Sequence, residues 1–535
     1  MQTIFIQYIY LVLIILALVM LANKIRIAYP IVLVVGGLLL SFLSQFGAIA
    51  IKPDLVFLIF LPPLLYEAAW QTSWKELWRW RRIVTSFAFP IVIITSCLIA
   101  FVSTAIIPGF TLALGFLLGA IISPPDAISA TTIMRQVKAP RAMTSIIEGE
   151  SLLNDASSLI VFRFALAAVI TGTFHFQDAA GSFFLVIIMG TIIGLAVAGI
   201  VYCIHRYLPT TPAIDIVLTL VTPYCMYYLA EHFHFSGVLA VVSGGLFLSH
   251  FRQRILNYRS RIESVNVWGS LVFVLNGLVF MLIGLQLPSI VSQLGDVSIG
   301  AAIGYGLAIS GALMLARLLC TYGAAAFTRV ASHFITVADP TPSWKAPLIL
   351  AWAGMRGVVS LAAALSIPLL TSNGEAFPHR SLILFITFVV ILTTLVLQGL
   401  TLPWLIRKID MDDRYTTIPE HKQELIIQKK IAHYSHQYLQ DHHPNAVPGN
   451  EHLENLLSRL HLDLKLLDNE LKEPEAEHLA ELRRFQHIYL DMLAHQREVL
   501  EKMNTKAEFD EEIIRKYMSI VDMEEYKLRE KLSEA

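Results

Sequence analysis

The stretch EGESLLNDASSL, from Glu148 to Leu159, carries two glutamates, an asparagine and an aspartate inside an otherwise apolar region. From Leu159 the chain continues as LIVFRFALAAVI, which extends a membrane-like segment. A charge at the centre of a bilayer costs at least ~2.5 kcal/mol even on the most lenient scale. Ionisable residues at such a position therefore indicate a functional site rather than a lipid-facing surface.

The composition indicates a polytopic, all-α membrane protein. Of the 535 residues, 56% are hydrophobic, and the mean hydropathy is +0.62. Apolar runs of roughly 20 residues recur through the first three quarters of the chain, and each can cross a hydrocarbon core about 30 Å thick. A β-barrel would instead show short alternating segments. The four cysteines lie in apolar stretches without disulfide or zinc spacing.

We expect thirteen membrane-spanning helices, at 4–22, 27–46, 55–70, 83–106, 110–134, 146–170, 182–205, 213–231, 236–249, 265–287, 298–328, 346–370 and 381–406. Sixteen lysines and arginines lie in alternate connections, whereas the other connections contain only Lys52 and Arg380. Because basic loops stay in the cytoplasm, we expect the N-terminus outside and the C-terminus inside.

The charge balance divides the chain into two parts. Residues 1–410 carry 23 Lys+Arg and 15 Asp+Glu, whereas residues 411–535 carry 17 and 26. We therefore predict a transmembrane domain over 1–410 and an acidic, helical, cytoplasmic domain over 411–535. Ten of the seventeen histidines lie in this tail. A pH sensor is one interpretation of them, and a solvated helical domain is the simpler one.

Two predicted segments are interrupted. The segment 110–134 contains Pro124 and Pro125, which remove backbone donors and break a helix. The segment 346–370 contains Gly354 and Gly357 on either side of Arg356. Breaks in corresponding segments of two halves are typical of a transporter's midplane site. Because the two segments are the fifth and the twelfth, an odd offset, we expect repeats of inverted topology.

Three ionisable residues reach a similar depth in the membrane. At 1.5 Å per residue, Asp155 lies about 13 Å into its segment, Asp126 about 12 Å and Arg356 about 15 Å. Two of the three, Asp126 and Arg356, sit at the breaks. The sequence therefore predicts a charged site near the bilayer centre.

The helical wheel of the sixth segment presents two polar faces. Asp155 shares one face with Ser151 and Ser158, which suits a small hard cation that prefers oxygen ligands. Glu150 shares the other face with Asn154, about 140° away from Asp155. We expect Glu150 to pair with Arg356, the cation nearest in depth, and this pair to fix the positions of helices.

Other polar residues of the segments are candidates for structural roles. We expect Glu67 and Arg317 each to pair with another residue inside the bundle. The sequence does not assign these two partners. Arg163 is a candidate structural counter-charge. Serine and threonine residues in these segments more often join helices than bind ligands.

Four motifs together resemble those of the monovalent cation:proton antiporters of the sodium/proton exchanger (NhaP/NHE) type, in particular the bacterial branch. They span residues 1–410 in the order of the family: LPPLLYEAAW, SPPDA, GESLLND and WAGMRGVVSLAAAL. The resemblance implies thirteen helices, two broken helices that cross, and a homodimer.

The resemblance also implies a cation site. It places Na⁺ at Asp155 and Asp126, with Asn154 and Ser151 in support, and it implies a Glu150–Arg356 pair. Many members of the family have Thr-Asp-Pro at the first break, where this chain has Pro125-Asp126-Ala127. A backbone carbonyl or water must then replace the threonine ligand.

The expected function is secondary antiport of a monovalent cation, Na⁺ first and Li⁺ or K⁺ next, against H⁺ across the plasma membrane. Burial disfavours a charged carboxylate, so protons and cations compete at Asp155. The alternatives are a K⁺-selective antiporter, a cation channel, which would need a filter, and a membrane aspartyl protease. We expect no enzyme activity, no resident cofactor and no nucleic-acid partner, and contacts only with the ions, lipid and a second copy.

Overall fold

The computed structural model describes residues 2–25, 27–42, 53–137, 139–172, 176–294, 297–334, 339, 343–371, 374–409, 420–443, 450–470, 475–504 and 511–533. The chain forms two compact units, Met1–Asp412 and Asp413–Ala535. We call them the membrane unit and the tail unit. Apart from one isolated bridge between Leu370 and Ala376, the regular structure of the described residues is helical.

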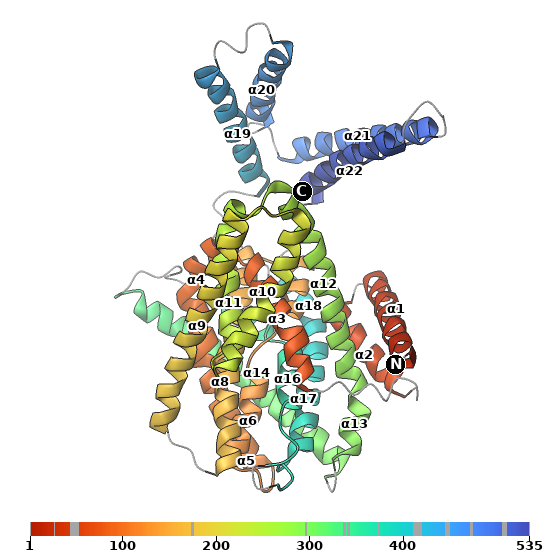
Figure 1. Ribbon diagram of the computed structural model, residues 1–535. Helices are drawn as coiled ribbons and strands as arrows, with labels where there is room; N and C mark the ends of the chain where they lie inside the picture. Colours follow the sequence, from red (N-terminus) through yellow and green to blue (C-terminus); the bar gives the residue numbers. More distant parts are fainter. Residues whose placement is uncertain are drawn as a thin grey trace. The chain divides into compact units, whose positions relative to one another are not determined.

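The helices of the membrane unit form one bundle (Figure 1). Their bounds are α1 Gln2–Ile25, α2 Tyr29–Ser41, α3 Pro53–Gln71, α4 Trp74–Ser86, α5 Val92–Ile106, α6 Leu112–Ile122, α7 Ala127–Gln136, α8 Arg141–Thr171, α9 Phe176–Tyr207, α10 Pro212–His232, α11 Gly237–Ile255, α12 Tyr258–Leu285, α13 Leu287–Ser292, α14 Ile299–Ala331, α15 Lys345–Trp352, α16 Val358–Leu365, α17 Arg380–Thr393 and α18 Gly399–Ile409. Two π-helical turns, η1 Phe87–Ile91 and η2 Thr394–Gln398, join α4 to α5 and α17 to α18.

Each predicted apolar segment falls on one or more of these helices. Among the described residues, eight helical stretches are long and apolar enough to cross a membrane. Two shorter apolar helices, Ile9–Ile25 and Tyr29–Ser41, precede them. The all-helical membrane fold is therefore confirmed, whereas thirteen crossings and inverted repeats stay predictions.

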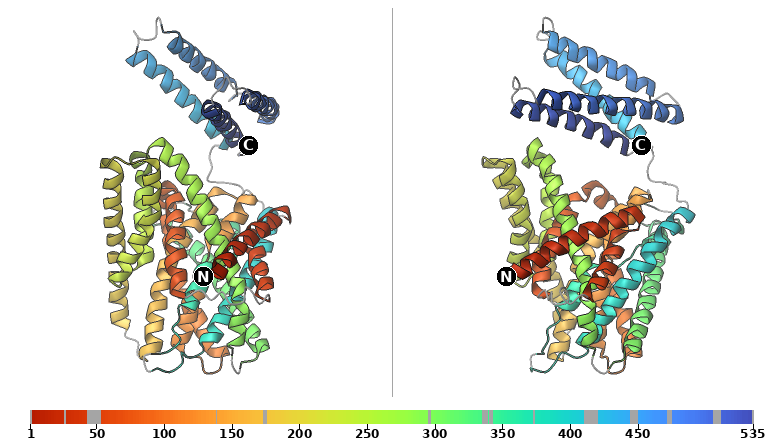
Figure 2. Two further views of the ribbon diagram at one scale, coloured as in Figure 1. Left: turned by 45° about the vertical axis from the view of Figure 1, so that its right-hand side comes forward. Right: turned by 90° about the vertical axis from the view of Figure 1, so that its right-hand side faces the viewer.

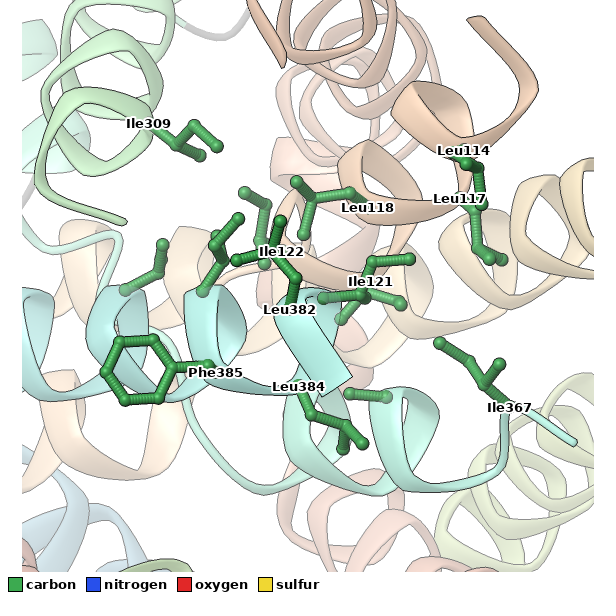
Figure 3. Packing of buried hydrophobic residues seen from close by; sticks show 14 of the residues in the cluster. Leu114, Leu117, Leu118, Ile121, Ile122, Ile309, Ile367, Leu382, Leu384 and Phe385 are labelled. Carbon is green, nitrogen blue, oxygen red and sulfur yellow. The ribbon is translucent and has the colours of Figure 1, made fainter. Parts of the chain in front are cut away.

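Two hydrophobic cores flank α8. One core joins α5, α6, α14, α16 and α17, with residues such as Leu118, Ile309 and Phe385 interleaved (Figure 3). The other core joins α3, α9, α10, α11 and α12. The helix α8 contributes Phe162 to the first core and Leu152 to the second. The helix that carries EGESLLND therefore lies between the two groups of helices.

In its described residues the tail unit has four helices, which pack as two pairs, α19 with α20 and α21 with α22 (Figure 2). Their bounds are α19 Glu420–His442, α20 Glu451–Glu470, α21 Glu475–Asn504 and α22 Glu511–Ser533. Leu425 and Ala432 of α19 are buried, as are Leu493, Ile514 and Val521 in the second pair. The stretch DHHPNAVPGN, Asp441–Asn450, leads from the end of α19 to the start of α20, and residues 444–449 within it lie outside the described residues.

Candidate functional site

The two helix breaks are in direct contact. Pro124 and Pro125 lie between α6 and α7, and Gly354 and Gly357 lie between α15 and α16. The backbone N–H of Asp126 in the first break donates a hydrogen bond to the carbonyl of Met355 in the second, with an N–O distance of 2.7 Å. The prediction of two broken helices that meet is therefore confirmed.

A glycine at position 357 lets the breaks approach this closely. A Cβ built on Gly357 would lie 2.3 Å from Oδ2 of Asp126, which is far inside van der Waals contact. The lack of space for a Cβ therefore favours glycine at this position.

Asp126 is held at the start of α7. Its Oδ1 accepts a hydrogen bond from the N–H of Ile128 at 3.1 Å, and its Oδ2 accepts one from Oγ of Ser129 at 3.4 Å. This is the N-cap position of the helix. A helix N-terminus stabilises a negative charge, so α7 favours the ionised form of this side chain.

Residues of α8 hold the first break in place. Oγ of Ser151 accepts a hydrogen bond from the N–H of Ala127 at 3.2 Å. Nδ2 of Asn154 donates one to the carbonyl of Pro125 at 3.3 Å. Oδ1 of Asn154 is buried and has no hydrogen-bond partner among the described residues. Asn154 and Ser151 therefore both contact the first break. The family resemblance had implied that these two residues support the site.

Asp155 is the carboxylate that remains available for a ligand. The residue is only 6% exposed, and no described residue donates a hydrogen bond to its side chain. Its charged neighbour is Asp126, which lies within electrostatic range. Two carboxylates, the hydroxyl of Ser151 and the amide oxygen of Asn154 thus converge where the breaks meet. This set of oxygen atoms suits a monovalent cation or a proton.

Glu150 faces the opposite side of α8 and pairs with Arg317 of α14. The two side chains form parallel hydrogen bonds, Nη1 to Oε1 and Nη2 to Oε2, each 2.8 Å long. The expected ion pair between Glu150 and Arg356 is therefore wrong. Depth along the helix had suggested Arg356, but the guanidinium of Arg317 on α14 reaches the carboxylate of Glu150.

The family model described as the transmembrane sodium/hydrogen exchanger matches residues 10–408. The chain belongs to the sodium/hydrogen exchanger family. It is therefore a multi-pass membrane protein and a cation/proton antiporter.

Relatives and solved structures agree with this assignment. The Na(+)/H(+) antiporter ApNhaP of Aphanothece halophytica is 31% identical over 91% of this chain and 87% of its own length. The sodium, potassium, lithium and rubidium/H(+) antiporter of Bacillus pumilus is 33% identical over 78% of this chain and 64% of its own. The sodium proton antiporter MjNhaP1 of Methanocaldococcus jannaschii has the same fold, with a TM-score of 0.59, 19% identity, and coverage of 76% of this chain and 99% of that one.

In this exchanger, Arg356 is bound by backbone carbonyls of the two breaks. Its guanidinium donates hydrogen bonds to the carbonyl of Ile122, at the end of α6, and to that of Gly354 in its own break. Its backbone N–H donates to Oγ1 of Thr394 at 3.1 Å. A broken helix leaves carbonyl groups without partners, and a cation at a helix C-terminus compensates them. Arg356 therefore stabilises the crossing of the two breaks and is not the ion-pair partner of Glu150.

Three further polar residues of the exchanger have partners that the sequence did not assign. Arg163, a candidate structural counter-charge, pairs with Glu231 of α10. Glu67 accepts a hydrogen bond from Gln71 on its own helix. Thr394, which holds Arg356, was missed entirely. Its signal was the Thr393-Thr394 pair inside an apolar run.

Proposed function

We propose that the protein exchanges Na⁺ for H⁺ at one site centred on Asp155. The observation that carries this proposal is a buried carboxylate with no hydrogen-bond donor among the described residues, next to Asp126 at the contact of two helix breaks. A structural carboxylate in such a place would have a donor or a paired cation. Glu150, which is equally buried, has Arg317.

The exchange follows from competition at this site. Asp155 holds either a cation or a proton, because both need the same carboxylate oxygens. A buried charge without a ligand is unfavourable, so the empty, ionised site does not cross the membrane. Only the two loaded states cross, and each turnover therefore moves a cation one way and a proton the other. The proton gradient then drives expulsion of the cation and regulates internal pH.

The geometry favours one proton for each cation. Asn154 does not titrate, and Glu150 is neutralised by Arg317. Asp126 caps α7 and accepts two hydrogen bonds that favour its ionised form, and we propose that it keeps its charge during the cycle. Asp155 alone then exchanges its ligand, and the cycle moves no net charge.

The cation preference rests on the ligand set. Asp155, Asp126 and backbone carbonyls of the break supply oxygen ligands, and water completes the shell in place of the absent threonine. We propose Na⁺ as the main substrate, with Li⁺ accepted. A K⁺-selective antiporter is the second candidate, because the Bacillus pumilus relative is named for sodium, potassium, lithium and rubidium.

The proposed setting is the plasma membrane, with the N-terminus outside and the tail unit in the cytoplasm. The basic residues of alternate connections support this orientation. We propose a homodimer that needs no resident cofactor and catalyses no covalent chemistry.

Proteoliposomes test the function directly. Purified protein is reconstituted with an internal pH dye, and Na⁺, Li⁺ or K⁺ is added outside in turn. We expect the internal pH to rise on addition of Na⁺, because internal H⁺ leaves as Na⁺ enters, and a smaller response to K⁺. Flux of Na⁺ without counter-movement of H⁺ would indicate a channel and would overturn the proposal. A response only to K⁺ would select the second candidate.

A further inference from the structure

The helix α4 carries an exposed surface of aromatic and basic side chains. Its sequence is WKELWRWRRIVTS, and the side chains of Trp74 and Trp78 are 45% and 58% exposed. The exposed basic residues of the helix are Lys75, Arg79, Arg81 and Arg82. Trp74 and Trp78 lie four residues apart and Arg81 three further on, so these three share one face of the helix.

This surface is organised by contacts between its own side chains. The rings of Trp74 and Trp78 are stacked, with centroids 6.4 Å apart and planes at 16°. The guanidinium of Arg81 lies 4.6 Å from the centroid of Trp78. A hydrogen bond of 2.6 Å from Nη1 of Arg81 to the carbonyl of Trp78 holds it there. The guanidinium of Arg81 has further N–H groups that can donate hydrogen bonds to a ligand.

The net charge of α4 is strongly positive. It has four basic residues and one acidic residue, Glu76, which leaves a formal charge of +3. The carboxylate of Glu76 accepts a hydrogen bond from Nε1 of Trp80 at 3.0 Å, so it is already engaged. Tryptophan prefers the headgroup level of a bilayer, and arginine binds phosphate groups through several N–H donors. A surface that combines both matches a phospholipid headgroup with a negative charge.

We propose that this face of α4 binds anionic phospholipids of the cytoplasmic leaflet. This proposal rests on the orientation in the proposed function, with the N-terminus outside and the tail unit in the cytoplasm. Charge complementarity selects this occupant, because a zwitterionic headgroup does not neutralise a charge of +3. Each basic side chain near an anionic leaflet strengthens binding by about fivefold.

A neighbouring face of α4, which carries Leu77 and Val84, contacts the helix that carries the ion site. A Cβ built on Gly149 of α8 would lie 3.0 Å from Leu77 Cδ1 and 3.0 Å from Val84 Cγ2, so the two helices are in close contact. Oγ of Ser157 on α8 also donates a hydrogen bond to the carbonyl of Ala88, just beyond α4. A lipid that restrains α4 therefore restrains α8 next to Glu150 and within two turns of Asp155, and we infer that it changes the exchange rate.

The experiment compares two double variants of equal charge change. Lys75→Gln with Arg81→Gln removes two charges from α4. Arg252→Gln with Arg254→Gln removes two from the exposed end of α11, on the same predicted side, where Arg254 also stacks on an aromatic ring. Lipid retention is measured by native mass spectrometry during titration with phosphatidylglycerol. We expect the α4 variant to need about thirtyfold more lipid for half occupancy, and the α11 variant to stay within about twofold of the wild type.

Exchange is then measured in vesicles of phosphatidylcholine and in vesicles with roughly one third phosphatidylglycerol. We expect the wild type and the α11 variant to change rate between the two compositions, and the α4 variant to show one rate in both. Equal lipid retention by the two variants would overturn the proposal, since diffuse surface charge would then explain binding. Trp74→Ala with Trp78→Ala should weaken retention while leaving the net charge intact.

A photoreactive amino acid at position 78 shows whether a lipid or another molecule occupies this surface of α4. We expect a phospholipid adduct in vesicles that contain phosphatidylglycerol. An adduct with peptides of the acidic tail in its place would overturn the proposal. If no variant exchanges ions in any vesicle, the proposed function fails, but the retention measurement still decides the lipid site.

Discussion

Arg317 and Glu150 form a buried, two-pronged ion pair between α14 and α8, with both N–O distances at 2.8 Å. The side chain of Glu150 is fully buried and that of Arg317 is 4% exposed. The pair lies on the side of α8 away from Asp155, and the nearby Gly354 packs against Arg317. It joins α8 to α14 and neutralises the carboxylate of Glu150.

Removing one partner of this pair leaves a buried charge uncompensated. We expect Glu150→Ala and Arg317→Ala each to lower the free energy of unfolding by about 3–5 kcal/mol, and the double variant to lose less than the sum. The measurement is thermal unfolding in detergent. Combining Glu150→Ala with Arg163→Ala serves as the control, and we expect near-additive losses because Arg163 pairs with Glu231 and lies thirteen residues along α8 from Glu150. Strict additivity for Glu150 and Arg317 would contradict the structure.

Replacing Asp155 by asparagine keeps the shape of the site but removes the exchanging carboxylate. We expect cation-driven proton movement to fall to roughly a tenth of the wild-type rate or less, because the variant neither titrates nor neutralises a cation. Thermal stability should stay close to that of the wild type, since no described residue donates to this side chain. Substantial residual exchange in proteoliposomes would move the site away from Asp155.

A methyl group at position 357 should separate the two helix breaks. The Cβ of Gly357→Ala would meet Oδ2 of Asp126 at 2.3 Å. Overpacking of this kind costs about 1–3 kcal/mol, and we expect loss of exchange together with lower thermal stability. Gly311→Ala in α14 is the matched control, because a Cβ there meets nothing within 4 Å. Wild-type exchange by Gly357→Ala would show that the contact of the breaks is not needed.

Exchange of one proton for one cation should be independent of membrane potential. In the proposed mechanism Asp155 releases the proton, whereas Asp126 is held by hydrogen bonds from Ile128 and Ser129. Proton flux in proteoliposomes should therefore be equal at K⁺/valinomycin potentials of opposite sign, and it should reverse with the concentration gradients. A systematic shift of rate with voltage would show that a second carboxylate titrates, and Asp126→Asn would identify it.

The tail unit should not set the pH dependence of exchange. In α22, hydrogen bonds from Arg529 and Arg497 lower the pKa of Glu525 below its ordinary value. The stability that this contributes is present above the ordinary carboxyl pKa and is lost only as the pH falls through the lowered value. This contribution to the stability of the tail unit is therefore constant over the range of cytoplasmic pH. A chain that ends at Arg414 should keep the pH–activity curve of the full chain, and a displaced curve would support a histidine sensor.

Hydropathy and composition were sufficient to predict the class of fold. Lipid offers no hydrogen bonds to the backbone, so long apolar runs must be helical, and every predicted segment lies on a helix. The breaks were also predictable, because Pro124, Pro125, Gly354 and Gly357 act on the local backbone. The carboxylates of Asp126 and Asp155 were found because burial of a charge is unfavourable wherever it occurs.

The sequence by itself therefore determined the membrane helices, the two breaks and the buried acids, all of which follow from properties of single residues and their immediate neighbours. The tertiary structure decided which groups meet. Arg317 rather than Arg356 pairs with Glu150. The guanidinium of Arg356 donates a hydrogen bond to the carbonyl of Ile122 rather than to a carboxylate. The periodicity of a helix gives the depth and direction of a side chain. The neighbouring helix that lies in that direction depends on the packing of the whole bundle.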